Sequence, residues 1–255
     1  MSRIIVLGAT GSLGKHVTEQ AVAANHEVSV LVRTPAKLPA NLRDHVTVHQ
    51  ADVTALPASQ LAALIRNQDA LINAAGHVSD GQRFVALVDH LVTSVETLPA
   101  SERPVCWFLA GAALLDIGDS GRRGVDFPQI AETYWPHAEN FARLQSSSLD
   151  WRLLCPGPMV EEPPVGLDRL RVLEDRLPVE IPDAAERLPD PDLVALFARL
   201  MPEMIVPYAD SAALMLHHLS PTDTMSRHRV GLALPIGMRG TKEQWSAHPA
   251  TGGSD

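Results

Sequence analysis

The residues with the clearest chemistry in this sequence are the glycines of Gly8-Ala9-Thr10-Gly11-Ser12-Leu13-Gly14. This segment follows a short apolar run, Arg3 to Leu7, and opens a stretch with helical spacing of apolar residues. In a turn from strand to helix, Gly8 permits a tight reversal and Gly11 lets a ligand approach the backbone. Gly14 lets the helix pack closely on the strand. The segment therefore predicts a turn built to receive a ligand.

The helix start behind these glycines supplies hydrogen-bond donors. Free backbone N–H groups at Ser12 and Leu13 are expected to face an anion, with the helix dipole behind them, and Thr10 adds a hydroxyl. The spacing is GxxGxxG, not GxGxxG. Because the turn lies after the first strand of a strand–helix–strand unit, we interpret it as binding the diphosphate of a dinucleotide. The alternative is that these are only turn glycines.

The end of the second expected strand, Glu27–Val32, indicates which dinucleotide binds. An acid at this place binds the ribose 2′-hydroxyl of NAD. Here the strand is followed by Arg33-Thr34-Pro35-Ala36-Lys37, which contains no acid. Arg33 can lie against a 2′-phosphate and Lys37 can add positive charge. The sequence therefore favours NADP(H) over NAD(H), and the alternative is that both are solvated loop cations.

Two further positions follow expected strands. Asp52, after the third strand, either accepts a hydrogen bond from the adenine amino group or caps its own turn. Asn73-Ala74-Ala75-Gly76 lies where the fourth strand would pass the nicotinamide half of the dinucleotide. The small side chains of Ala74, Ala75 and Gly76 leave room for a cofactor there. Asn73 either contacts the cofactor or only orders the end of the strand.

Strand and helix patterns alternate along the first half of the chain. Expected strands are Arg3–Leu7, Glu27–Val32, Val46–His49, Ala70–Ala75, Pro104–Leu109 and Trp151–Cys155, and expected helices are Ser12–Asn25, Leu56–Ile65, Phe84–Leu98 and Ile130–Ser147. This alternation predicts an α/β fold in which a doubly wound parallel sheet carries helices on both faces.

The second half of the chain is richer in proline and less regular. It contains two further helical patterns, Asp190–Leu200 and Ala209–Leu219, and a last strand, Arg229–Leu234. We expect a nucleotide-binding domain over residues 1–159 and a small irregular C-terminal region on its substrate side over 160–236. Residues 237–255 are expected to form a flexible tail.

Composition excludes several classes of protein. The 255 residues carry 21 Lys and Arg against 30 Asp and Glu, a net charge of −9, which argues against nucleic-acid binding. Cys106 and Cys155 are far apart and form no CxxC motif, so neither a disulfide framework nor a structural zinc site is expected. The longest apolar run, Val105 to Leu115, is too short to span a membrane. The sequence predicts a soluble, cytoplasmic protein.

Together these motifs make the chain similar to the short-chain dehydrogenase/reductase superfamily. It resembles the atypical branch that includes NmrA-like and biliverdin reductase B-like (flavin reductase) proteins. The resemblance covers about Met1 to Met159 and, more loosely, Met204 to Ala233. In the second half it rests on Leu109–Leu114, on Leu149-Asp150-Trp151 with the following Pro156-Gly157, and on Asp210. It implies a Rossmann-type fold that binds NAD(P)(H) and transfers a hydride.

The chain departs from the superfamily in its proton relay. Typical members use Ser, Tyr and Lys, with Tyr and Lys spaced YxxxK. Neither tyrosine fits, because Tyr134 has Ala138 four residues on and Tyr208 has Ala212. The serine expected after the fifth strand is replaced at or near Gly111. The usual relay is therefore absent.

Other side chains could supply a proton. Tyr134 and His137 are three residues apart and share one face of a helix, and histidine titrates near neutrality. The alternative is that both lie on the helix surface without a role. His77, directly after Gly76, is another candidate at the cofactor edge. A metal site at His217-His218 is not expected, because adjacent helical side chains point apart.

Two functions follow from the sequence. The first is an NADP(H)-dependent oxidoreductase that reduces a small organic molecule, such as a flavin, quinone or conjugated compound, which needs little help from a protein acid. The second is a non-catalytic NADP(H)-binding sensor of NmrA-like type, which the missing Ser-Tyr-Lys set favours. The expected partner is a small-molecule substrate, with neither nucleic acid nor membrane. A homodimer is left open.

Overall fold

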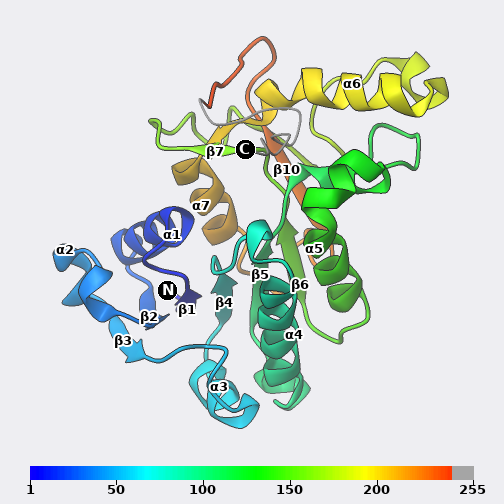
Figure 1. Cartoon of the computed structure of the whole chain (residues 1–255). Helices are drawn as coiled ribbons and strands as arrows, with labels where there is room; N and C mark the ends of the chain where they lie inside the picture. The colour runs from blue at the N-terminus through cyan, green and yellow to red at the C-terminus, as the bar shows by residue number, and fades with distance from the viewer. Residues whose placement is uncertain (243–255) are drawn as a thin grey trace, which may run out of the picture.

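The computed structural model describes residues 1–242, which are built around an eight-stranded sheet (Figure 1). Its strands are β1 (Arg3–Leu7), β2 (Glu27–Val32), β3 (Thr47–Gln50), β4 (Ala70–Asn73), β5 (Val105–Leu109), β6 (Trp151–Leu154), β8 (Arg171–Glu174) and β10 (Arg229–Ala233). Their order is β3-β2-β1-β4-β5-β6-β10-β8, and all pairs are parallel except β10 with β8. The order reverses between β1 and β4, which is where doubly wound sheets bind ligands at the carboxyl ends of their strands. The predicted fold class is confirmed.

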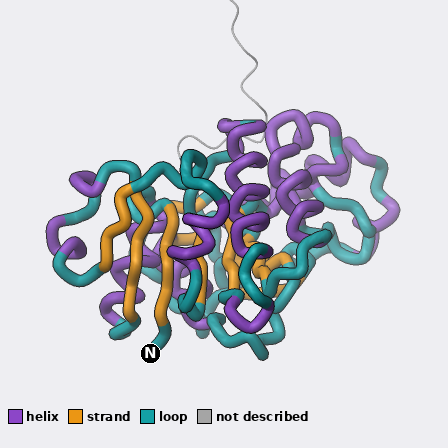
Figure 2. The backbone as a smooth tube through the Cα atoms, turned by 90° about the horizontal axis from the view of Figure 1, so that it is seen from below, coloured by secondary structure: helices purple, strands orange, loops and turns teal. Residues whose placement is uncertain are grey.

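The helices cover both faces of this sheet (Figure 2). They are α1 (Ser12–Ala23), α2 (Ala40–Arg43), α3 (Ala58–Ile65), α4 (Gln82–Glu96), α5 (Pro128–Gln145), α6 (Asp190–Leu200) and α7 (Tyr208–His217). Successive residues of β1 point to opposite faces. Ile4 and Val6 belong to the core cluster that holds α1 and α7, whereas Ile5 and Leu7 belong to the cluster that holds α3, α4 and α5. Each face of the sheet therefore has its own apolar core.

Short turns and a small second sheet complete the chain. The 3₁₀ turns are η1 (Pro35–Lys37), η2 (Val78–Asp80), η3 (Ala100–Glu102), η4 (Ala112–Leu114), η5 (Gly124–Asp126), η6 (Asp183–Arg187) and η7 (Met201–Met204). The second sheet pairs β7 (Met159–Val160) with β9 (Val206–Pro207).

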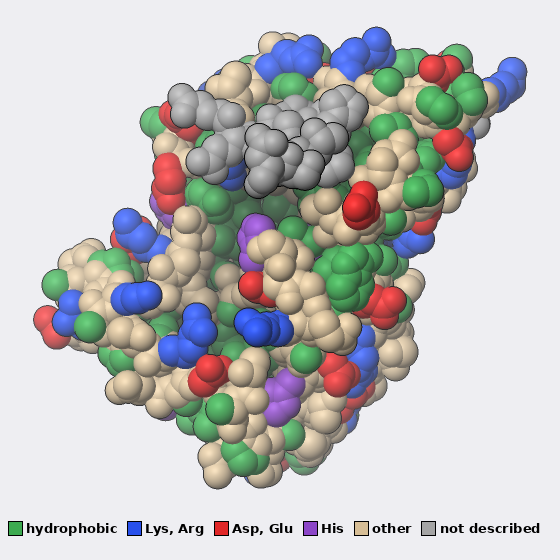
Figure 3. Space-filling model, in the orientation of Figure 1, with side chains coloured by type: hydrophobic (Ala, Val, Ile, Leu, Met, Phe, Trp, Pro, Cys, Tyr) green, Lys and Arg blue, Asp and Glu red, His purple; other side chains and the backbone are tan. Residues whose placement is uncertain are grey.

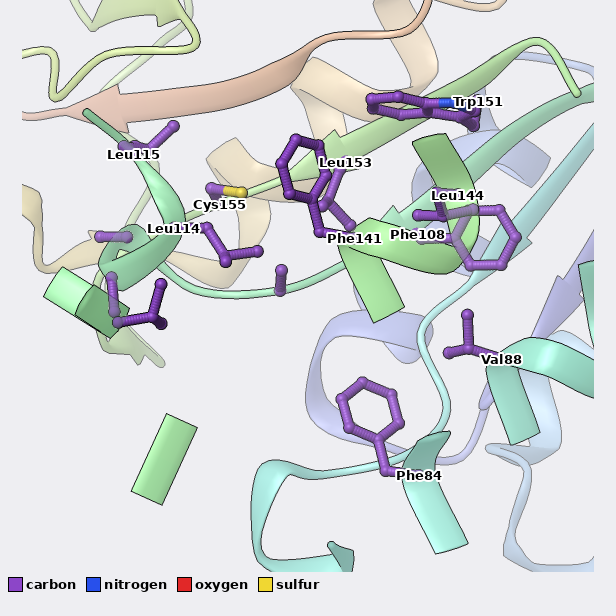
Figure 4. Close-up of a cluster of buried hydrophobic side chains, with 14 of the residues drawn as sticks. Phe84, Val88, Phe108, Leu114, Leu115, Phe141, Leu144, Trp151, Leu153 and Cys155 are labelled. Carbon is purple, nitrogen blue, oxygen red and sulfur yellow. The ribbon is translucent and has the colours of Figure 1, made fainter. Parts of the chain in front are cut away.

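Aromatic side chains fix the position of α5 against the sheet. Phe141 meets the Trp151 ring edge to face at 6.0 Å, and Phe108 on β5 lies in the same cluster (Figure 4). Pro136 lies inside α5, which begins at Pro128 and continues to Gln145. The helix therefore begins two residues before the predicted Ile130 and continues through this proline.

The boundaries of the elements differ from the predicted ones by a few residues. The first helix ends at Ala23, and Asn25 takes a left-handed conformation with φ +59°, a position that glycine often fills. The irregular region after Glu161 contains a strand that the sequence did not reveal, β8, which extends the main sheet by pairing with β10.

The predicted tail lies only partly within the described residues, because residues 243–255 fall outside them. Before that point, Gly240 N–H donates to Pro202 O over 2.8 Å and Lys242 Nζ donates to Met159 O over 2.8 Å. Among residues 1–242, no helix combines the length and apolarity needed to cross a bilayer. Cys106 and Cys155 are free and buried, and burial raises the pKa of both thiols, as expected for inert side chains.

Candidate nucleotide-binding and catalytic site

The turn from β1 to α1 requires glycine at two of its three positions. Gly8 has φ +79°, and a Cβ there would lie 2.6 Å from the Ala74 carbonyl carbon. A Cβ on Gly14 would lie 2.1 Å from Gly8 O. At Gly11, by contrast, the nearest atom would be Gly8 O at 3.4 Å, so the fold itself leaves room for a side chain. The absence of a side chain at Gly11 therefore fits close approach by a ligand.

The start of α1 has donors without protein partners. Gly11 is the N-cap residue, and within residues 1–242 no side chain caps the helix. The first N–H groups of a helix, here those of Ser12 and Leu13, have no intrahelical acceptor. The first turn also contains no acidic residue. These features suit an anion such as a diphosphate, and Thr10 is exposed beside them.

Arg33 directly follows β2, at the carboxyl end of the strand, and Lys37 lies further on, in η1. The register pairs Leu7 with Leu31, so the residues after β2 continue next to the glycine turn. Both side chains are exposed, and no residue of the described chain forms a hydrogen bond or ion pair with either. Both cations are therefore accessible to an anion, although the Arg33 charge also acts on the nearby Asp52 carboxylate.

Asp52 follows β3, at the same carboxyl-end edge of the sheet as Arg33. Its Oδ1 accepts hydrogen bonds from Thr54 Oγ1 at 2.8 Å and Thr54 N–H at 3.0 Å. These two bonds, with a smaller effect of the Arg33 charge, lower the pKa of Asp52. Of the two predicted roles, turn capping is the one seen, and contact with an adenine stays a prediction.

The segment after β4 meets the glycine turn, since Ala74 is the residue that packs on Gly8. Asn73 is buried, its Oδ1 accepts from Ala75 N–H at 3.2 Å, and its Nδ2 has no partner within the described chain. It thus orders the strand end, as one alternative held, and keeps one free donor. Gly76 has φ +92°, and a Cβ there would lie 2.4 Å from Phe84 Cδ2.

His137 lies buried at the centre of the catalytic candidates. The Phe84 ring meets the imidazole edge to face at 5.8 Å, and the Tyr134 ring stacks on it at 6.0 Å. A Cβ on Gly111 would lie 3.3 Å from His137 Nε2, so the absence of a serine side chain there gives the imidazole its space. His137 Nδ1 is buried without a partner among residues 1–242.

The protonation of these side chains differs from the simple expectation for histidine. Burial, and to a smaller extent the nearby His77, lower the pKa of His137 to about 4. His137 is therefore neutral at pH 7, where it can donate one hydrogen bond and accept another, but it is not a cationic acid. Burial raises the pKa of Tyr134, which therefore keeps its phenolic proton.

The structure links the predicted residues into one region. Gly8 packs on Ala74, Gly76 packs on Phe84, and Phe84 contacts His137, so the phosphate turn and the catalytic candidates lie at one edge of the sheet. In the view of Figure 3 the surface is hollowed between its two halves, with Lys and Arg side chains nearby.

Two residues of this region were missed by sequence reasoning. Phe84 was expected only as the start of a helix. Asn140 was not considered, although it is buried and both polar atoms of its amide lack partners in the described chain. The signal was its place three residues after His137, on the same helix face. The expectation that the side chains of His217 and His218 point apart was wrong, because α7 ends at His217 and the two rings meet edge to face at 5.1 Å. His218 Nδ1 is bonded to Asp223.

A comparison with family models supports a nucleotide-binding role for this chain. A family model described as NAD(P)H-binding matches residues 8–184. The uncharacterized protein YwnB of Bacillus subtilis is 26% identical over 159 residues, which are 60% of this chain and 71% of YwnB.

Solved structures resemble the fold over nearly its whole length. The oxidoreductase ylbE of Lactococcus lactis has 17% identity and a TM-score of 0.64, covering 93% of this chain and 92% of its own. ChuY, an anaerobilin reductase of Escherichia coli O157:H7, has 16% identity and a TM-score of 0.61, covering 92% and 98%. At these identities the likeness concerns the fold.

Proposed function

Because the chain belongs to the NAD(P)H-binding family whose model spans residues 8–184, we propose that it is an NADP(H)-dependent oxidoreductase. The observation that carries this proposal is the uncapped start of α1 behind the Gly8–Gly14 turn, with Arg33 exposed beside it. The names of two structural neighbours, an oxidoreductase and a reductase, support the same class of reaction.

We infer which residues would hold the phosphate-bearing parts of the cofactor. The N–H groups of Ser12 and Leu13 would hold the diphosphate, and Arg33 with Lys37 would face the 2′-phosphate. The free Nδ2 of Asn73 offers a buried donor beside the glycine turn. When bound, the nicotinamide supplies the hydride.

The protein's own contribution is to orient the reactants and donate hydrogen bonds. Tyr134 and His137 would present neutral donors to the molecule that is reduced. Neither is a cation at neutral pH, and the Ser-Tyr-Lys relay is absent from the sequence. The best substrates are therefore conjugated compounds such as flavins or quinones, in which the added negative charge is spread over several atoms.

The proposal is tested by mixing the protein with NADPH and a panel of flavins, quinones and aldehydes and following the cofactor absorbance. Oxidation with flavins or quinones, and slower oxidation with aldehydes, is the expected result. Tyr134→Phe should lower the rate without weakening NADPH binding.

A non-catalytic sensor remains the second candidate, because the sequence lacks the usual proton relay. Tight NADPH binding with no turnover on any compound of the panel would favour the sensor over the enzyme. No binding of NADPH or NADH would contradict both.

A further inference from the structure

The turn that follows β4 holds a histidine in a defined orientation. His77 is the N-cap of η2, and its backbone N–H donates to Asp80 Oδ2 over 3.0 Å. The Ser79 backbone N–H donates to His77 Nδ1 over 3.2 Å, and Ser79 Oγ lies 2.8 Å from the same nitrogen. The imidazole is thus attached to its own turn through one ring edge.

These bonds determine the tautomer of His77. A backbone N–H can only donate, so Nδ1 must accept and cannot carry a proton while this bond exists. The single proton of the neutral ring is then on Nε2, on the opposite edge from the turn. His77 therefore offers one N–H donor directed away from Ser79.

The turn that holds His77 lies next to α5, the helix that carries Tyr134 and His137. Helix α5 packs against η2, and a Cβ on Gly81 would lie 3.6 Å from Trp135 Cζ2, in the same helix. Gly76, the residue before His77, packs on Phe84, which contacts the His137 ring. His77 is exposed where His137 is buried, so of the two imidazoles it is the more accessible to a substrate.

We propose that His77 is a further catalytic residue of this site, which uses its Nε2–H as a neutral hydrogen-bond donor to the substrate atom that becomes electron-rich on reduction. This inference rests on the proposed function. In the step, a C–H bond of the bound reduced nicotinamide would break and a new bond to hydrogen would form on the substrate, so that the nicotinamide is oxidised as the substrate is reduced. The electron pair displaced in the substrate moves to an oxygen or nitrogen, which His77 stabilises and water then protonates.

A neutral imidazole can do this without acting as an acid, because it keeps its proton throughout the step. Such a donor suits a conjugated substrate, whose negative charge is delocalised. It suits a simple ketone less, since a localised alkoxide needs a proton from a stronger acid. The Nε2–H tautomer of His77 therefore favours conjugated substrates, as the absence of the Ser-Tyr-Lys set also does.

His77→Asn separates the catalytic role from the structural one. Asparagine is a good N-cap whose side-chain oxygen can accept the Ser79 N–H, but it carries no Nε2–H at the imidazole position. We expect NADPH affinity and melting temperature close to those of the wild type, with kcat for the best quinone or flavin lowered roughly 100- to 1,000-fold. Ser79→Ala, which keeps the backbone N–H, is the matched control and should react at nearly the wild-type rate.

A spectroscopic measurement tests the tautomer independently of turnover. In ¹⁵N-histidine-labelled protein, the long-range ¹H–¹⁵N spectrum should show His77, assigned by its loss in His77→Asn, with the proton on Nε2. A proton on Nδ1, or full activity of His77→Asn, would overturn the inference while the proposed function stands. A wild-type protein that binds NADPH but reduces nothing would overturn the proposed function, and the catalytic role of His77 with it.

Discussion

Arg33 is the residue whose charge bears most directly on cofactor choice. It is exposed beside the glycine turn, and no hydrogen bond or ion pair within residues 1–242 occupies it. Hydrogen bonds to charged groups contribute about 1.5–3 kcal/mol, so Arg33→Glu should weaken NADPH binding roughly 10- to 100-fold. NADH lacks the 2′-phosphate and should bind almost as before. Fluorescence titration with both dinucleotides checks this, with Arg33→Lys as control, and equal weakening of both would remove the assignment.

His137 should make the stability of the protein depend on pH. Its pKa in the folded protein is about 4, below the ordinary value of 6.5, so between these values the unfolded chain binds more protons. The free energy of unfolding should therefore rise with pH over this window and fall as the solution is acidified. This group alone accounts for roughly 3 kcal/mol between pH 7 and pH 4.

The measurement is urea unfolding of the wild type and of His137→Gln at several pH values. The variant lacks the titrating group, so the difference in unfolding free energy between the two proteins should change in favour of the variant as pH falls from 7 to 4. A difference that is constant over this range would show that His137 titrates normally in the folded state.

At the scale of the element, the glycine turn provides a matched pair of substitutions. Gly11 has φ −89° and space for a Cβ, so Gly11→Ala should leave the melting temperature nearly unchanged and weaken NADPH binding. A Cβ on Gly14 would meet the Gly8 carbonyl oxygen at 2.1 Å, so Gly14→Ala should destabilise the fold by about 1–3 kcal/mol. Calorimetry and NADPH titration on both variants test the pair. If Gly11→Ala binds NADPH normally, the ligand does not approach there.

The elements that the sequence predicted best are two short strands with clear ends. The strands β1 and β2 begin and end at the predicted residues, because each is a short segment rich in Val, Ile and Leu with turn-forming residues close to its end. The strand β8 was missed because it lies at the sheet edge in a proline-rich region, where pairing with β10 rather than local preference forms it.

The sequence predicts the part of the site in which the backbone requires glycine. It predicts the surroundings of the buried side chains less well. Gly8 and Gly14 are needed by close backbone contacts that leave a sequence signature. The environment of His137, between Phe84, Tyr134 and Gly111, combines three separate segments, so its burial and low pKa could not be read from spacing.

At the scale of the whole molecule, Arg229 joins the far edge of the sheet to the loop that carries Gly111. From β10 its Nη1 donates to Leu114 O at 2.6 Å and to Asp116 Oδ1 at 3.1 Å, and its Nε donates to Asp175 Oδ1 at 3.0 Å. The guanidinium also lies 5.0 Å from the Phe141 ring centre, against α5. One buried cation thus connects β10, the end of β8, α5 and the loop after β5.

Arg229→Met should therefore destabilise the protein and loosen the site together. It leaves Asp116 without its cation and Asp175 with only His228 as a side-chain partner. The cost lies between the value for an exposed pair and the 3–5 kcal/mol of a buried one, or about 2 kcal/mol. We expect the melting temperature to fall by roughly 4–8 °C. Because Leu114 and Gly111 share a loop, turnover should fall more than NADPH affinity. Arg176→Met removes an exposed cation paired with Asp119 and should change little. Equal melting temperatures for the two variants would show that Arg229 does not hold the loop.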